Sequence, residues 1–181
     1  MSSSSKIEAP AAERNKEPIW QVLQAKVLPL VRQASVVPKD DSQDTLRILE
    51  IAAGTGVHTL YFSQQLLEQS IPYLWYPTDP EVSSLASIQA YLQDDKRVQD
   101  YVKTPSFLTL TPDGILETNS VLAELMRDKA NIILTINMIH VAPWSITTGL
   151  IKAANSLLKP GGILFLYGPF RVQGTYVESN R

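Results

Sequence analysis

The run from Arg47 to Gly56, RILEIAAGTG, constrains the fold of this chain more than any other stretch. Its first half is apolar apart from Arg47 and Glu50, which is typical of a strand buried on both faces of a parallel sheet. Its second half ends in Gly54 and Gly56, and glycine permits the positive φ and the close approach of backbone to ligand that a tight turn requires. The run therefore predicts a strand, a turn and a helix that form a ligand site at the carboxyl edge of an α/β sheet.

The remaining hydrophobic pattern alternates between strand and helix periods. Strands are expected at 46–52, 71–77, 106–110, 131–138 and 163–167, and helices at 18–28, 57–69, 80–93, 116–127 and 145–158. This order predicts a Rossmann-like, doubly wound, mostly parallel sheet of about five strands. Pro18 suits the first position of the first helix, and Pro29 is expected to kink or end that helix. Residues 168–181 are rich in turn formers, so no further strand or helix is expected there.

Length and composition bound the class of protein. The chain has 181 residues, 44% hydrophobic and 19% charged, which is enough for one globular domain. We expect residues 1–9 to be a disordered lead and residues 10–181 to form a single domain. The formal net charge of -2 argues against a strongly basic surface for nucleic acid or membrane, and the absence of cysteine excludes disulfides and thiolate metal sites. With no secretory signal and no apolar run near the ~18 residues of a membrane span, a cytoplasmic protein is the default expectation.

The spacing at the glycine turn separates two classes of cofactor. Counted from Gly54, a dinucleotide fingerprint would place glycine or alanine at Thr59; counted from Ala52, Gly54 and Gly56 follow at alternate positions but the first residue is alanine. S-adenosylmethionine has no phosphate but carries a sulfonium, an ammonium and a ribose diol, so acids near the turn suit it. Asp79 ends the second strand, where its carboxylate can accept the ribose hydroxyls.

We therefore expect an S-adenosylmethionine site and no metal. Its cofactor-binding residues are Glu50, Ala52, Gly54, Thr55, Gly56, Asp79 and Asn137. The alternative interpretation is an ordinary strand, turn and helix followed by an aspartate that caps a helix.

Further polar and aromatic residues are expected at the same edge of the sheet. Methyl transfer is an in-line displacement that needs a donor held close to a nucleophile, a dry pocket and sometimes a base. His140 follows the fourth strand and titrates in a useful range, so it is the candidate base, with a loop-capping role as the equal alternative. His58 is expected to be a surface or packing residue. The candidates on the acceptor side are Arg14, Asn15, Trp144 and Tyr167, for which helix capping, core packing and a turn are the alternatives.

Taken together, these runs resemble a known family. The residues that carry the resemblance are Ala11–Ile19, Leu49–His58, Trp75–Asp79, Ile136–His140 and Tyr167–Phe170. They resemble the methyltransferase-like protein twenty-six family, which is similar to class I S-adenosylmethionine-dependent methyltransferases. The resemblance implies a seven-stranded Rossmann-like sheet, with Glu50 and Gly54–Gly56 beside the methionine part of the cofactor and Asp79 on the ribose. It implies no particular acceptor.

The sequence departs from that family at two points. Thr109 stands where the family places an acid after the third strand, so an adenine contact is not supported there, and Asp113 is only a weak substitute. Family members continue through another helix and two strands beyond Arg181, so we expect a C-terminally truncated domain whose fifth strand is an uncovered edge.

The expected function is methyl transfer from S-adenosylmethionine to a small molecule or a protein, with no nucleic-acid or membrane partner. A non-catalytic cofactor-binding or scaffold protein of the same fold is the alternative, favoured by Ala52 and Thr109. A nicotinamide-dependent oxidoreductase is disfavoured by Thr59 and by the spacing of the glycines.

Overall fold

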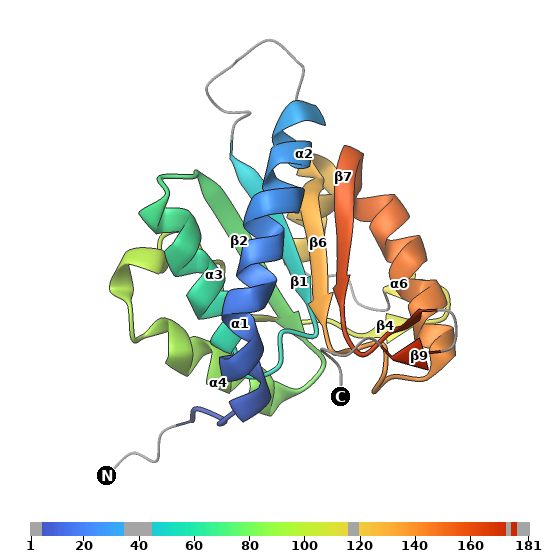
Figure 1. Ribbon diagram of the computed structural model, residues 1–181, viewed down its shortest axis with the longest axis horizontal. Coiled ribbons are helices and arrows are strands. Elements are labelled where there is room, and N and C mark those ends of the chain that lie inside the picture. Colours follow the sequence, from blue (N-terminus) through green and yellow to red (C-terminus); the bar gives the residue numbers. More distant parts are fainter. Residues whose placement is uncertain (1–4, 35–44, 116–119, 173–174, 177–181) are drawn as a thin grey trace.

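A five-stranded parallel sheet forms the centre of the computed structural model, which describes residues 5–34, 45–115, 120–172 and 175–176 (Figure 1). The strands lie in the order β3-β2-β1-β6-β7, and every neighbouring pair is parallel. Their bounds are β1 Leu46–Ile51, β2 Tyr73–Asp79, β3 Ser106–Phe107, β6 Ala130–Ile136 and β7 Leu158–Tyr167. The predicted Rossmann-like, doubly wound sheet is confirmed, and its strand order reverses between β1 and β6.

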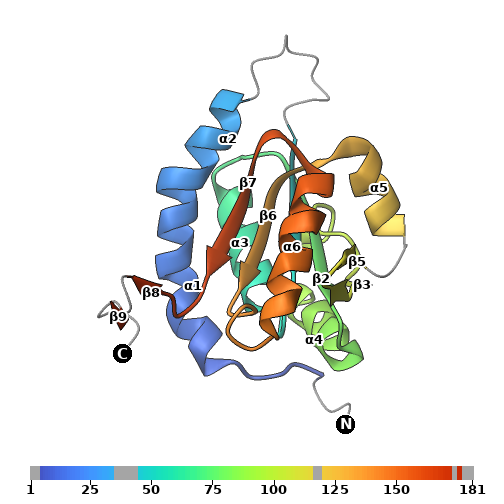
Figure 2. The ribbon, with the colours of Figure 1, turned by 90° about the vertical axis from the view of Figure 1, so that its right-hand side faces the viewer.

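Helices cover both faces of this sheet. On one face, α1 (Pro10–Val22), the π-helical segment η1 (Leu23–Val27) and α2 (Leu28–Ala34) form one long rod, with α3 (Val57–Glu68) beside α1. On the other face lie α5 (Ser120–Asp128) and α6 (Trp144–Leu157), as the rotated view of Figure 2 shows. Helix α4 (Val82–Leu92) packs against α3, and the short 3-10 helix η2 (Lys96–Val98) follows it. No helix in the described part of the chain is long and apolar enough to cross a membrane.

The first helix corrects the sequence prediction at both ends. It begins at Pro10, so Pro18 lies inside α1 and not at its first position. Pro29 lies inside α2 and does not end the rod. Just before it, the Leu28 N–H donates to the Leu23 carbonyl, five residues back, and not to the carbonyl four residues back. This wider turn separates the Pro29 ring from the carbonyl of Ala25, four residues earlier, with which it would clash in a regular α-helix.

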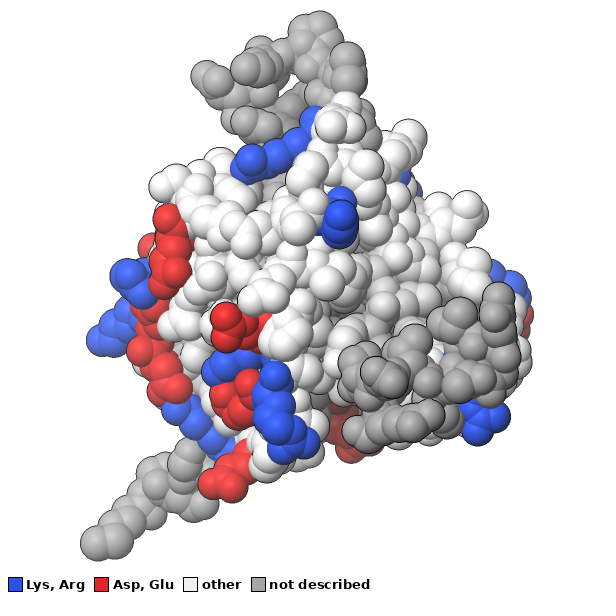
Figure 3. Space-filling model, viewed as in Figure 1, with Lys and Arg blue, Asp and Glu red and all other residues white. Residues whose placement is uncertain are grey.

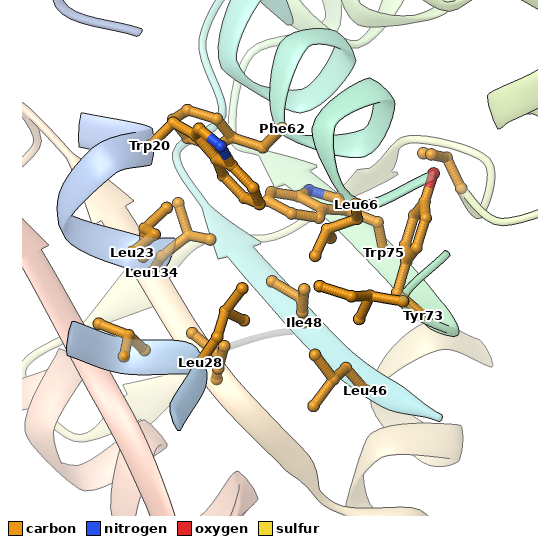
Figure 4. Close-up of a cluster of buried hydrophobic side chains, with 14 of the residues drawn as sticks. Trp20, Leu23, Leu28, Leu46, Ile48, Phe62, Leu66, Tyr73, Trp75 and Leu134 are labelled. Atoms are coloured by element: carbon orange, nitrogen blue, oxygen red, sulfur yellow. The ribbon is translucent and has the colours of Figure 1, made fainter. Parts of the chain in front are cut away.

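The core has one apolar cluster on each face of the sheet. Beneath the rod, the ring centroids of Trp20 and Phe62 are 6.0 Å apart, and those of Phe62 and Trp75 are 6.1 Å apart (Figure 4). A void of about 10 Å³ lies among apolar side chains here, next to Leu23 and Leu28 of the rod. It offers a water molecule no polar partner, so it is a packing defect of the core and not a ligand site.

The short elements differ from the sequence prediction. The expected strand 106–110 is only the short β3, after which β4 (Leu110–Thr111) and β5 (Gly114–Ile115) form a hairpin. The hairpin packs tightly on α6, where a Cβ added at Gly149 would lie 1.6 Å from the Thr111 carbonyl oxygen. Strand β7 begins earlier than expected. The prediction of no strand beyond residue 168 is wrong, because β8 (Arg171–Val172) pairs with β9 (Thr175–Tyr176).

The first described residues, 5–9, run along α4, while residues 1–4 of the expected lead lie outside the described residues. On the face shown in Figure 3, acidic and basic side chains are intermixed over the lower part of α1 and over the adjoining α3 side of the molecule. The described part of this face therefore carries both signs of charge side by side.

Candidate functional site

The carboxyl ends of β1, β2 and β6 meet at one edge of the sheet, at the reversal of strand order where open α/β sheets bind their ligands. The glycine turn, residues 52–56, follows β1 at this edge. Asp79 ends β2 and Asn137 follows β6, so the predicted cofactor-binding residues come from three adjacent strands. The topology thus brings them to one place.

The two glycines of the turn have different tasks. Both have a positive φ, 61° at Gly54 and 96° at Gly56. A Cβ added at Gly54 would meet no atom within 4 Å, whereas one added at Gly56 would lie 2.6 Å from the Ile88 Cα. Gly54 therefore leaves open space beside the backbone, and Gly56 allows α4 to pack against the turn.

Neighbouring elements hold the turn by hydrogen bonds at its amide and its carbonyl. The Gly54 N–H donates to Asp79 Oδ2 at 2.8 Å, and the Ser87 hydroxyl donates to the Thr55 carbonyl at 2.8 Å. Asp79 Oδ1 accepts the Glu81 N–H at 2.9 Å. The Asp79 side chain is nearly buried, yet each carboxylate oxygen uses only one of its lone-pair positions in these bonds. Asp79 therefore fixes the turn and retains acceptor capacity.

Glu50 lies beneath the turn, on the face of the sheet covered by the rod. Its Oε2 accepts hydrogen bonds from Thr59 Oγ1 at 2.6 Å and from Trp75 Nε1 at 2.8 Å. The residue is only 2% exposed, and burial raises the pKa of its carboxyl group to about 7 against the lowering effect of these bonds. Glu50 thus connects β1, α3 and β2, while a direct contact with a ligand stays a prediction.

Two residues other than glycine have a left-handed backbone at this edge. Ala52 has φ 56° after β1, and Asn137 has φ 61° after β6, the neighbouring strand. Asn137 tolerates this region because its side chain is short and polar, whereas alanine is strained there by about 1 kcal/mol or more. The Asn137 N–H donates to the Tyr167 carbonyl at 2.8 Å, so Tyr167 at the end of β7 lies beside it.

Helix α1 reaches the site through Asn15. Asn15 Oδ1 lies 2.8 Å from Nε2 of His58, in the first turn of α3 directly after the glycine turn. Burial lowers the pKa of His58 to about 4, so the imidazole is neutral at pH 7 and donates its Nε2 proton to the amide oxygen. His58 packs between the two helices, with its ring centroid 5.5 Å from that of Phe62. Arg14, the preceding residue of α1, is exposed.

His140 and Trp144 lie on the exposed rim of the same edge. His140 is exposed in the loop after β6, and a Cβ added at Gly168 would lie 3.6 Å from its Nδ1. Trp144, the first residue of α6, is 75% exposed. Asp113 lies in the β4–β5 hairpin, at a different part of the surface. Its carboxylate forms an ion pair with Lys152 of α6 at 2.9 Å. Thr109 is half-buried between β3 and β4.

The sequence interpretation missed three residues of the site. Thr59 entered it only as an argument against a dinucleotide, Trp75 only as part of a family motif, and Ser87 not at all. The apolar stripe of α4 does not mark Ser87, because consecutive helical residues point about 100° apart and Ser87 lies beside Ile88 and off the stripe. No local pattern pairs Thr59 and Trp75 with Glu50, since all three meet only after the sheet has formed.

The fold is that of class I methyltransferases. Similar solved structures include the DszA carbon methyltransferase, at 20% identity and a TM-score of 0.52 over 88% of this chain and 36% of that one. The glycopeptide N-methyltransferase MtfA has 16% identity and a TM-score of 0.52 over 89% of this chain and 54% of that one. PKMT2 from Rickettsia typhi, solved in complex with AdoHcy, has 16% identity and a TM-score of 0.51 over 75% and 23%.

The chain belongs to the family described as a protein of unknown function (DUF938), whose sequence pattern matches residues 6–181. It spans about half or less of the length of the solved structures to which it is similar. At these identities the likeness to solved structures establishes the fold alone.

Proposed function

We propose that this chain binds S-adenosylmethionine at the glycine turn and transfers its methyl group to an acceptor. The observation that carries the proposal is the bond between Asp79 at the end of β2 and the Gly54 N–H of the turn after β1. It places a carboxylate beside an open turn at the reversal of strand order, the arrangement that a ribose diol and an adenosyl group require.

The residues present fit this cofactor. Asp79 has lone pairs left for hydroxyl donors, and the open space at Gly54 admits a ligand close to the backbone. We assign the methionine side of the site to Ala52, Gly54, Thr55 and Gly56, with Asn137 at the neighbouring strand end. Glu50 lies in β1 just before these residues, and its ionised form would favour a cationic ligand near the turn.

The acceptor side of the site is assigned to the rim. Bound S-adenosylmethionine supplies an electrophilic methyl group on a sulfonium, which leaves as a neutral thioether when a nucleophile attacks in line. An acceptor that carries a proton must lose it, and the exposed His140 is our candidate base. Trp144, Tyr167, Arg14 and Asn15 surround the same edge as candidate contacts to a small-molecule or protein acceptor. The resemblance to the methyltransferase-like protein twenty-six family supports methyl transfer but implies no particular acceptor.

A second candidate function is cofactor binding without methyl transfer. Ala52 favours it, because this position has φ 56° and alanine takes the place that glycine would fill without strain. Release of S-adenosylhomocysteine with any member of a broad acceptor panel would exclude the second candidate. Tight binding without such release across the panel would favour it.

Calorimetric titration of the full chain with S-adenosylmethionine and with S-adenosylhomocysteine tests the proposal. We expect binding by the wild type, and a loss of about ten- to a hundredfold in affinity in Asp79→Asn, because hydrogen bonds to a charged carboxylate are lost. Asp100→Asn is the matched control, since Asp100 is exposed after η2. No binding by a folded wild-type chain, or binding of NAD in its place, would contradict the proposal.

A further inference from the structure

One buried hydroxyl, that of Ser87, joins the first described residues of the chain to the glycine turn. The Ile7 N–H donates to Ser87 Oγ at 2.9 Å, and the same hydroxyl donates to the Thr55 carbonyl at 2.8 Å. Ser87 is 0% exposed. A hydroxyl has a single proton, so the bond to Thr55 leaves its lone pairs to accept the Ile7 N–H. The two hydrogen bonds therefore form a chain that runs from residues 5–9, the N-terminal segment, into the turn.

Other contacts hold the N-terminal segment on the same helix. Lys6 forms an ion pair with Asp94, just beyond the end of α4, and its ammonium lies 5.2 Å from the ring centroid of Tyr91. The Tyr91 hydroxyl donates to the Ile7 carbonyl at 3.3 Å. These contacts are exposed and individually weak. The bond from Ile7 to Ser87 is part-buried and ends on a fully buried hydroxyl, so it is expected to dominate the attachment.

Helix α4 controls the turn at two adjacent residues. The Ile88 backbone packs against Gly56 so closely that a Cβ there would lie 2.6 Å from the Ile88 Cα. Ser87, the residue before it, holds the Thr55 carbonyl between the two glycines. Loss of the Ile7 donor would weaken the remaining bond of the hydroxyl, because hydrogen bonds in a chain polarise one another.

We propose that Ser87 is a positioning residue that couples the N-terminal segment to the glycine turn, so that attachment of residues 5–9 sets the affinity of the turn for an adenosyl ligand. This inference rests on the proposed function. It assigns to the N-terminal segment a role in ligand binding without any direct contact with the ligand.

Calorimetric titration of the full chain with S-adenosylhomocysteine tests the coupling in three variants. Ile7→Pro removes the donor N–H at a 40% exposed position and leaves Ser87 in place. Ser87→Ala removes both bonds, and Ser83→Ala is the matched control at an exposed position of the same helix. We expect about three- to tenfold weaker binding in Ile7→Pro and in Ser87→Ala, the effect of one hydrogen bond, and no change in Ser83→Ala.

The double variant separates coupling from two independent effects. If the segment acts through Ser87, Ile7→Pro combined with Ser87→Ala binds no more weakly than Ser87→Ala alone. Trypsin cleavage after Lys6 gives a second readout, and we expect faster cleavage in Ser87→Ala than in Ser83→Ala, with slower cleavage of the wild type when ligand is bound. Ile7→Pro tests the coupling even if Ser87→Ala fails to fold.

The outcomes distinguish this inference from the proposed function. If Ile7→Pro binds S-adenosylhomocysteine as tightly as the wild type, the coupling is overturned and the proposed function stays intact. The same holds if the losses of affinity in the two single variants add up in the double variant. Absence of binding by the folded wild type would overturn the proposed function and the coupling with it.

Discussion

Replacement of Glu50 by glutamine tests whether the buried carboxyl group is neutral in the folded chain. Burial raises its pKa to about 7 from an ordinary value of 4.5. Between these two pH values the unfolded chain has released a proton that the folded chain still holds, so the free energy of unfolding falls as the pH rises. At about 1.4 kcal/mol per pH unit, this one group lowers the free energy of unfolding of the wild type by roughly 3 kcal/mol by pH 8.

The glutamine variant should escape this loss. The hydrogen bonds from Thr59 and Trp75 both end on Oε2 of Glu50, so the carbonyl oxygen of glutamine can accept both. We expect the free energy of unfolding of Glu50→Gln minus that of the wild type to lie near zero at about pH 4 and to reach roughly 3 kcal/mol in favour of the variant at pH 8.

The difference between the two proteins is the quantity to measure, because His58 has the opposite pH dependence. Burial lowers its pKa to about 4, so the wild type also loses stability as the pH falls below the ordinary value of 6.5. This contribution is common to both proteins and cancels in the difference. Urea unfolding from pH 4 to pH 8 provides the assay, with the exposed Glu17→Gln as a matched control. A difference that does not change with pH would refute the reasoning.

Four further substitutions test the turn, its packing and the buried histidine that follows it. Gly56→Ala should destabilise the fold by about 2–4 kcal/mol in thermal unfolding, because its Cβ would meet the Ile88 backbone, whereas Gly54→Ala has open space and should lose only about 1 kcal/mol to its positive φ. Equal losses would contradict this account. Ala52→Gly should raise the free energy of unfolding by about 0.5 kcal/mol, because removal of the strain at φ 56° outweighs the greater conformational freedom of glycine in the unfolded chain. A decrease above about 1 kcal/mol would contradict the strain at Ala52. In urea unfolding, the free energy of unfolding of His58→Gln minus that of the wild type should rise by roughly 3 kcal/mol between pH 6.5 and pH 4, because the contribution of Glu50 is common to both proteins and cancels; a difference that stays constant with pH would show that His58 does not titrate in this way.

Much of the fold could be predicted because it depends on local patterns. The apolar run before Gly54 specifies a strand buried on both faces, and alternation with helical stretches leaves few arrangements other than a doubly wound sheet. Part of the prediction was wrong where the backbone adjusts in a way that the residue types do not encode. Pro29 is tolerated because the π-helical segment before it widens the backbone, and nothing in the residues around Pro29 announces that segment.

The candidate site divides in the same way. The sequence by itself determined that Gly54, Gly56 and Asp79 reach one edge of the sheet, because glycine spacing and strand ends are local features. Only the tertiary structure decided that the Glu50 carboxyl group accepts a hydrogen bond from Trp75, and that Ser87 joins Ile7 to Thr55. The physical reason is that a side chain's period along the chain fixes the face it occupies, whereas its partner and its pKa depend on which distant element packs against that face.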